Sequence, residues 1–264
     1  MSSITKIGWT GFFGEKTGRN WNCITGCTFD NIDCLNCYAM WQSNRWAGVR
    51  KAYEGVTEMS SNGLHWTGKI NLNEDELSFP LHRKQPTAFF VNSMSDMFHK
   101  DVPFEFIQKM FDVMNKCRQH IFQILSKRSD RLLELSPQLN WTENIWMGVS
   151  VGHEESKYKI DDLRKTDANI KFLSLEPLTS PLSNIDYSGI RWVIVGAESG
   201  HNARYMDLSW VRDILKDCRR SEAAFYMKQI CRGGKKIPLD EFPQDLQVWE
   251  YPIKQLDEVK KIRI

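Results

Sequence analysis

Long apolar runs are absent from this sequence of 264 residues, and so is any large excess of charge. No stretch approaches the ~18 apolar residues that a helix needs to cross a bilayer, and the residues after Met1 lack the apolar core of a signal peptide. Against 35 basic side chains stand 33 acidic ones, and this balance by itself does not indicate nucleic acid. We therefore expect a cytoplasmic protein without a membrane partner.

Thiols, in contrast, are concentrated in one short segment. Cys27, Cys34 and Cys37 fall within eleven residues, separated by six and then two residues. Because a reducing cytoplasm keeps thiols unpaired, this segment indicates a metal or redox site rather than disulfides. Thiolates are soft ligands for zinc, copper(I) and iron–sulfur clusters. A structural zinc site usually closes with four protein ligands, whereas three cysteines on an iron–sulfur cluster leave one iron open to another ligand.

Two alternatives to such a cluster stay open. Cys23 is a candidate fourth ligand, which would favour a closed zinc site, and free cysteines are often buried simply as small hydrophobic residues. The usual spacing in radical S-adenosylmethionine (SAM) enzymes is three and then two residues, with an aromatic residue before the last cysteine. Here Asn36 precedes Cys37 and Tyr38 follows it. His99, His120 and His153 have no ligand-like spacing with the thiols.

Apolar runs that alternate with helical patterns indicate the fold class. Buried strands are expected at residues 87–91, 120–125, 145–151, 170–175, 192–195 and 224–227, and another near 21–24 delivers the cysteine segment. Helices are expected at 38–46, after Asp101 with Pro103 in the first turn, and around Val211 and Ile214. About seven strands in this order predict an α/β protein with a complete or partial parallel barrel. We expect one domain, 1–264, with a long connection carrying short helices at about 47–86.

Polar residues follow each of these runs. Active sites of parallel barrels lie at the carboxyl ends of the strands, so we expect these side chains to meet at one rim. A charge directly after a buried strand needs a partner there, and Gly196 would allow a ligand to approach the backbone. The candidate residues are Asn92, Ser93, Asp96, Ser126, Lys127, Arg128, Ser150, Glu176, Gly196, Glu198 and Lys228.

Short motifs over nearly the whole length resemble those of one family, the phage and mobile-element proteins with a three-cysteine motif, a domain of unknown function grouped with radical-SAM enzymes. The six-then-two cysteine spacing also agrees with that family. Gly8, Cys23 and Ala197 depart from its pattern, where Glu, Pro and Gly are expected. The matching stretches are residues 5–7, 25–27, 36–39, 66–69, 91–98, 127–128, 148–151, 176–178, 192–200 and 228–229.

The resemblance implies a partial α/β barrel that uses a 4Fe–4S cluster and SAM. Cys27, Cys34 and Cys37 would then hold the cluster, and an external donor would supply the electron. We expect SAM to lie near Asn92, Ser93, Ser126, Ser150, Glu176 and Gly196. We expect the substrate to lie near Asp96, Lys127, Arg128, Glu198 and Lys228.

The resemblance also implies an activity of the isomerase or lyase type, in the cytoplasm of the host cell if the gene belongs to a phage. Our leading hypothesis is a monomer that rearranges or modifies a nucleic-acid base or nucleotide, such as the hypermodified thymidine of phage DNA. One alternative is a base-lesion repair enzyme of the spore-photoproduct-lyase type. The other is a zinc-stabilised nucleic-acid-binding protein without catalysis.

Overall fold

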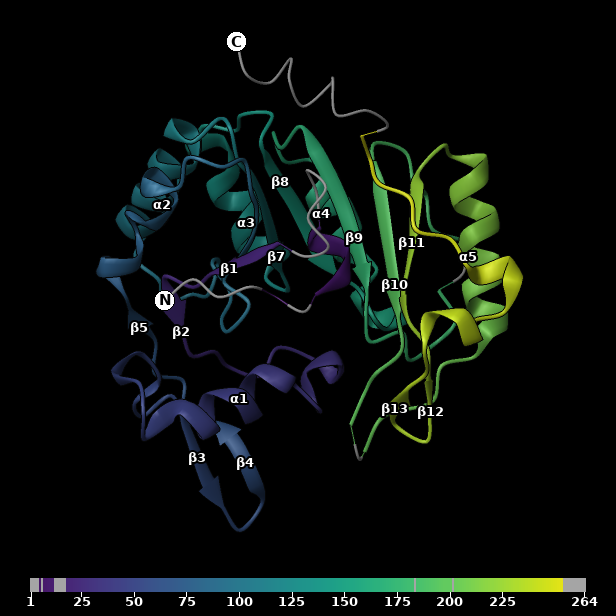
Figure 1. Cartoon of the computed structure of the whole chain (residues 1–264), viewed down its shortest axis with the longest axis horizontal. Helices are drawn as coiled ribbons and strands as arrows, with labels where there is room; N and C mark the ends of the chain where they lie inside the picture. The colour runs from purple at the N-terminus through teal and green to yellow at the C-terminus, as the bar shows by residue number, and fades with distance from the viewer. Residues whose placement is uncertain (1–4, 6, 12–17, 183, 201, 254–264) are drawn as a thin grey trace.

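The computed structural model describes residues 5, 7–11, 18–182, 184–200 and 202–253. Its centre is a seven-stranded sheet in which all neighbouring strands are parallel. In spatial order the strands are β1 (Arg19–Trp21), β6 (Ala88–Val91), β7 (Ile121–Ser126), β8 (Ile145–Ser150), β9 (Ile170–Leu175), β10 (Trp192–Gly196) and β11 (Ala224–Gln229). The sheet curls into a half-barrel with β1 and β11 at its two edges (Figure 1).

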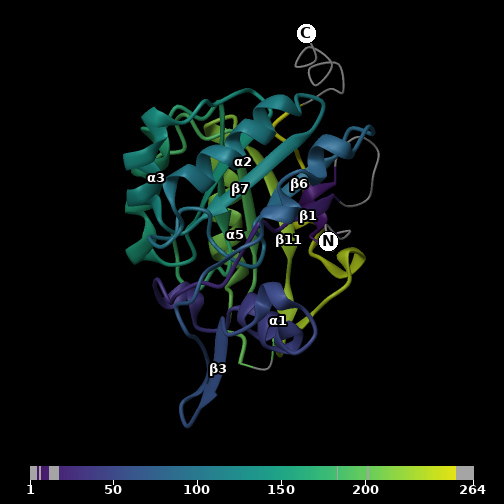
Figure 2. The same ribbon diagram turned by 90° about the vertical axis from the view of Figure 1, so that its left-hand side faces the viewer.

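The strands are apolar on both faces because each face packs against a hydrophobic layer. On the outer face, residues such as Phe122 and Ile124 join the main core with the apolar sides of α2 (Phe104–Lys116), α3 (Ser129–Leu135), α4 (Tyr158–Arg164) and α5 (Leu208–Arg220). These helices run along the outside of the half-barrel (Figures 1 and 2). Pro103 directly precedes α2, and the side chain of Asp207 caps α5 by accepting from the Ser209 N–H at 2.8 Å.

The inner face is filled by an aromatic cluster. Trp192 lies at its centre, with ring centroids at 5.7 Å from Trp9, 5.8 Å from Phe172 and 6.1 Å from Tyr226. Trp9 comes from the 3-10 turn η1 (Gly8–Thr10), outside the sheet. These rings fill the interior of the half-barrel.

Smaller elements gather at the carboxyl ends of the strands. The helix α1 (Tyr38–Ala47) lies across this end, and the hairpin of β3 (Thr57–Ser60) and β4 (Gly63–Trp66) projects beyond it (Figure 1). The remaining short strands are β2 (Ile24–Thr25), which pairs with β5 (Asn71–Leu72), and β12 (Cys231–Arg232), which pairs with β13 (Lys235–Lys236). No helix among the described residues is long and apolar enough to cross a membrane.

One edge of the sheet is covered by chain that follows it. The N–H of Met227 donates to the carbonyl of Val248 at 2.8 Å, and the N–H of Glu250 donates to the carbonyl of Phe225 at 2.9 Å. Tyr226 and Trp249 form an antiparallel bridge between these two bonds. Residues 248–250 therefore pair with the edge of β11 that faces away from β10.

The sequence predictions are largely confirmed, with two corrections. The parallel α/β half-barrel and the helices at 38–47 and 208–220 are as expected, and the strand boundaries agree within two residues. The single strand expected near 21–24 is instead two strands, because the chain leaves the sheet after Trp21 and Ile24 pairs with Leu72. The connection at 47–86 carries the β3–β4 hairpin as well as the short helical turns.

The inner aromatic cluster leads to a prediction about stability. Trp192→Ala removes a fully buried indole and leaves a cavity that the neighbouring rings cannot close, so we expect the free energy of unfolding to fall by about 3–5 kcal/mol. The matched control is Trp41→Ala, whose side chain is 57% exposed and whose loss is expected to cost at most about 0.5 kcal/mol. Urea unfolding curves of both variants test this. Equal losses would show that the cluster does not support the sheet.

Candidate active site at the carboxyl ends of the strands

The cysteine segment contains little regular structure of its own. A bridge between Gly26 and Ser95 places its beginning beside the loop after β6. Its middle is the turn η2 (Ile32–Cys34), started by the Asn31 side chain, which accepts from the Asp33 N–H at 3.0 Å. Cys37 directly precedes α1. The position of the thiols therefore depends on contacts that the segment makes with the sheet.

The first of these contacts is centred on Asp96, a buried carboxylate in the loop after β6. It accepts from the Ser126 hydroxyl at 2.7 Å and from the Lys127 N–H at 2.9 Å, and it pairs with the Arg128 guanidinium at 3.1 Å. Arg128 in turn donates to the carbonyl of Thr28 at 2.8 Å. This chain of bonds joins the residue after Cys27 to the ends of β6 and β7.

A second contact holds the middle of the segment to β8 and α4. Asp33 accepts from the Gly152 N–H at 3.0 Å, and Lys159 donates to Asp30 at 2.6 Å although the lysine is almost completely buried. A Cβ at position 152 would lie 2.1 Å from the carbonyl oxygen of Pro177 and 2.7 Å from the Asp33 carboxylate. Only glycine permits this approach.

The third contact ties the end of the segment to β10. Arg204 forms a two-point ion pair with Glu198, at 2.6 Å between Nη2 and Oε1 and at 2.9 Å between Nε and Oε2. Asn36 donates to the same carboxylate at 2.9 Å, and Arg204 also donates to the carbonyl of Ile32 at 2.8 Å. Burial alone would raise the pKa of Glu198, but these donors outweigh burial and hold that pKa below its ordinary value.

Held in this way, the three thiols line one cavity of ≈ 130 Å³. Burial raises the pKa of Cys27 to about 12, against the opposing charge of Arg128. Burial also raises the pKa of Cys37, although the N–H of Met40 in the first turn of α1 and the charge of Lys127 oppose it. Within the described ranges, no three His, Cys, Asp or Glu side chains form a group that could hold a single metal ion.

A second cavity of ≈ 140 Å³ adjoins the first, and Cys37, Tyr38 and Lys127 line both. Lys127 donates to the Ser150 hydroxyl at 3.1 Å. Burial alone would lower the pKa of Lys127, but nearby thiols and carboxylates outweigh burial and raise it. Glu176 and Lys228 form an ion pair on the lining of this cavity.

The structure brings the predicted site residues to two neighbouring places. The thiol cavity is lined by Cys27, Cys34, Cys37, Asn92, Ser93, Asp96, Ser126, Lys127 and Arg128. The second cavity is lined by Ser150, Glu176, Glu198 and Lys228, together with Lys127. All of the predicted residues except Gly196 therefore line these two adjoining spaces at the rim.

Three of these residues have contacts that the sequence did not indicate. Gly196 lines neither cavity, because the space above it is filled by Glu176 and Gln229, whose atoms would lie 3.2 and 3.3 Å from an added Cβ. Asn92 is buried and accepts from the Ile24 N–H at 3.3 Å, which holds β2 against the sheet. Both carboxylate oxygens of Asp96 accept hydrogen bonds from other residues of the protein, because a buried carboxylate requires such donors.

Sequence reasoning missed several residues that hold the cysteine segment. His99 contacts the Thr28 hydroxyl at 2.9 Å, and Asp33, Lys159 and Arg204 make the contacts described above. The acidic residues within the cysteine segment were the available signal, since a carboxylate between apolar residues needs a buried donor. Their partners lie more than 100 positions away in the chain and have no motif. The thiols of Cys23, Cys117 and Cys218 are buried in the main core, away from the cavities.

Comparison with known proteins places the chain in a family. The model of the family described as "Protein of unknown function (DUF5131)" matches residues 5–244. The chain belongs to this family. That agrees with the expected domain of unknown function, while the description mentions neither phages nor cysteines.

Two further comparisons concern curated proteins and solved structures. No curated protein matches the sequence. A mutant of spore photoproduct lyase matches with a TM-score of 0.45 and 10% identity, over 81% of this chain and 76% of that chain. A likeness at this level carries no function from one chain to the other.

The Asp96–Arg128 pair leads to a second prediction. Arg128→Met leaves a buried carboxylate without its cation and releases Thr28, so we expect the free energy of unfolding to fall by about 3 kcal/mol or more. The control is Arg220→Met, which removes an exposed pair with Asp217 and should cost at most about 1 kcal/mol. Urea unfolding measures both. A loss in Arg128→Met no larger than in the control would remove Asp96–Arg128 from the anchoring contacts.

A third prediction concerns pH. The pKa of Glu198 is lower in the folded protein than in the unfolded chain, so its stabilising effect is present above about pH 4.3 and is lost as pH falls through the folded pKa. The difference in unfolding free energy between the wild type and Glu198→Gln should therefore be constant near neutral pH and shrink below about pH 4. Unfolding curves recorded across this range provide the measurement. A difference that stays constant in acid contradicts the assignment.

Proposed function

We propose that this protein is a radical-SAM enzyme in which Cys27, Cys34 and Cys37 hold a 4Fe–4S cluster. The observation that carries the proposal is the convergence of all three thiols on one cavity at the carboxyl ends of a parallel half-barrel. Catalytic groups of parallel barrels gather at this end of the strands. These three cysteines would hold the cluster, and a bound cluster would provide the electron for reductive cleavage of SAM to methionine and a 5′-deoxyadenosyl radical.

The residues present fit an iron–sulfur cluster in their chemistry. Three soft donors come from one short segment, and the first and last of them line the cavity beside the cations of Arg128 and Lys127. These cations favour the thiolate form, which is the form that binds metal. Burial favours the protonated form of the free thiols, but this preference no longer applies once a metal ion replaces the proton.

The second cavity suits the amino-acid part of the cofactor SAM. Its lining offers the Ser150 hydroxyl, the Glu176 carboxylate and the Lys127 ammonium next to the shared wall with the thiol cavity. A carboxylate accepts charge-assisted hydrogen bonds from an ammonium group, and a lysine donates them to a carboxylate. These side chains would bind and orient an amino acid of that kind, with Lys127 positioned between the two cavities.

For the substrate we propose a nucleic-acid base or nucleotide, with rearrangement or modification of the base as the reaction and hypermodified thymidine as one product class. The support is chemical: Lys228 brings a second ammonium group to the lining of this cavity, and ammonium groups bind phosphate. A lyase acting on damaged bases would use the same residues. The residues of this cavity would position the reacting group of the substrate and would not act as a general acid or base.

Iron content tests the proposal directly. After anaerobic reconstitution, the variants Cys27→Ala, Cys34→Ala and Cys37→Ala should each retain less than about one-fifth of the wild-type iron, because each loses a ligand. Cys117→Ala and Cys218→Ala are matched controls whose thiols lie in the core, and they should load iron like the wild type.

The same samples distinguish the other functions. Iron and sulfide that depend on the three cysteines, together with SAM-dependent release of 5′-deoxyadenosine, support the enzyme. A colourless protein with zinc in a fixed ratio to the chain would replace it with the zinc-stabilised binding protein. Full iron loading in any one of the three variants would remove that cysteine from the ligand set.

A further inference from the structure

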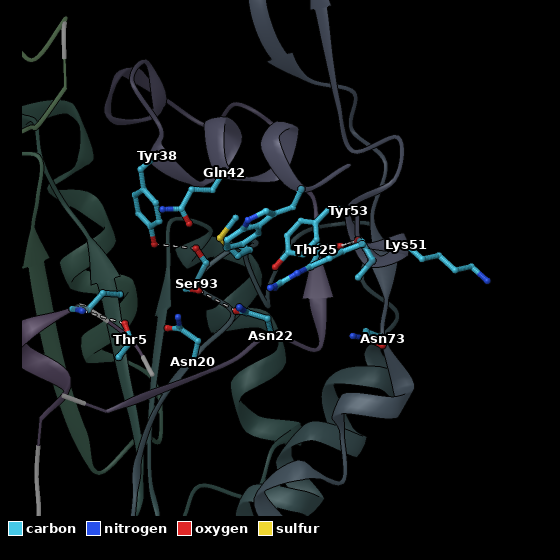
Figure 3. A pocket seen from close by; sticks show the side chains of 15 residues that line it. Thr5, Asn20, Asn22, Thr25, Tyr38, Gln42, Lys51, Tyr53, Asn73 and Ser93 are labelled. Carbon is cyan, nitrogen blue, oxygen red and sulfur yellow. Dashed lines mark hydrogen bonds between the residues drawn. The ribbon is translucent and has the colours of Figure 1, made fainter. Parts of the chain in front are cut away.

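A third and larger cavity lies beside the site, and the function proposed above assigns it no ligand. It has a volume of ≈ 520 Å³ and is bounded by α1, the turn η3 (Lys51–Tyr53) and residues of the edge strand β1 and the segment that follows it. Pockets of about 300–1,000 Å³ accommodate small organic ligands. Figure 3 shows its polar side chains converging from several elements.

Amide side chains dominate the polar lining of this cavity. The Oδ1 atom of Asn20 is buried without a hydrogen-bond partner, and the side-chain amides of Gln42 and Asn73 make no hydrogen bond to any described residue. In Figure 3, Asn20 and Asn22 lie on one side of the space, with Gln42 across from them. Each amide offers a donor next to an acceptor. A ligand that presents donors and acceptors side by side along a flat edge would satisfy them.

Aromatic rings and one cation complete the lining. The rings of Trp46 and Tyr53 contact each other at 5.1 Å, and the Arg50 guanidinium carbon lies 4.8 Å from the Trp46 ring centroid. Arg50 makes no ion pair within the part of the chain that the structure describes. Its charge is therefore available to an anion, whereas Lys51 extends away from the cavity (Figure 3).

The cavity shares a wall with the thiol cavity. Tyr38 and Ser93 line both spaces, and the Tyr38 hydroxyl donates to the Ser93 carbonyl at 2.9 Å. Tyr38 directly follows Cys37 in the chain. A ligand in the large cavity is thus separated from the thiols by one tyrosine ring.

We propose that this cavity binds a nucleotide, with its base between the amides of Asn20 and Gln42 and its phosphate at Arg50. Flat heterocyclic edges that alternate donors and acceptors match side-chain amides, apolar rings suit the faces of a base, and a guanidinium matches phosphate. The chemistry is the same for a free nucleotide and for one unit of a DNA strand. A catalytic use of this nucleotide would rest on the function proposed above, but nucleotide binding itself does not.

Calorimetric titration of the full chain, with and without reconstituted iron, tests the inference. The probes are thymidine 5′-monophosphate, 2′-deoxyguanosine 5′-monophosphate, thymidine, a short single-stranded oligothymidylate and ribose 5-phosphate. We expect at least one base-containing probe to bind more tightly than ribose 5-phosphate. Tighter binding of the oligothymidylate would identify DNA as the source of the nucleotide, and tighter binding of a monophosphate would identify the free form.

Variants locate the binding in the cavity. Gln42→Leu and Asn20→Asp should each weaken nucleotide binding about three- to tenfold, because each removes or mismatches one hydrogen bond. Asn44→Leu is the matched control on the same helix, exposed and outside the cavity, and should bind like the wild type. Arg50→Met should reduce the preference for thymidine 5′-monophosphate over thymidine, while Arg45→Met should not.

The outcomes separate this inference from the proposed function. Binding that is absent, or unchanged in Gln42→Leu, overturns the inference; Gln42 is exposed on α1, so this variant does not depend on tolerance in the core. Equal affinity for ribose 5-phosphate also overturns it, because the base would then contribute nothing. Nucleotide binding in a protein that takes up neither iron nor SAM would support the inference while contradicting the proposed function. Iron and SAM binding without nucleotide binding would do the reverse.

Discussion

The need to satisfy buried carboxylates organises the candidate site. Asp96, Asp33 and Glu198 lie under or within the cysteine segment and are largely inaccessible to water. A carboxylate in such a place requires hydrogen-bond donors. Asp96 and Glu198 each accept several hydrogen bonds, whereas Asp33 accepts through Oδ2 alone, and its Oδ1 atom has no partner among the described residues. The donors come from residues that follow β7, β8 and β10 and from the cysteine segment itself. A segment with little secondary structure is thereby fixed at three points along a curved sheet.

The half-barrel provides the geometry that these bonds require. In a parallel sheet all strands have their carboxyl ends on the same side, so residues that are far apart in the sequence lie close together there. The aromatic cluster fills the inner face of the sheet, and the cavities lined by the candidate residues lie beyond it at the rim. Tyr38 lines all three cavities at this rim, and a change in its side chain would alter their connections together.

The sequence predicted the sheet better than it predicted the site. Strands such as 170–175 are continuous apolar runs because both of their faces are buried, and this pattern is local. The rim also followed from the sequence, since polar residues after parallel strands must share one end. The partners of the cysteine segment did not, because Asp33 and Gly152, or Asn36 and Glu198, are joined by tertiary packing. The split of the strand near Trp21 was missed for the same reason. An apolar residue at position 24 suits the seven-stranded sheet and the β2–β5 pair equally well, so the sequence does not tell them apart.

The pairing of residues 248–250 with β11 has a consequence for a chain that is still being synthesised. A half-barrel, unlike a closed barrel, leaves two strands with backbone groups that no neighbouring strand satisfies, and such edges are templates for aggregation. β1 limits this exposure by its length of three residues. The longer β11 relies on residues 248–250, which come after it in the sequence. During synthesis, or in a chain cut before Val248, residues 225–227 of β11 would be open to pairing with another molecule.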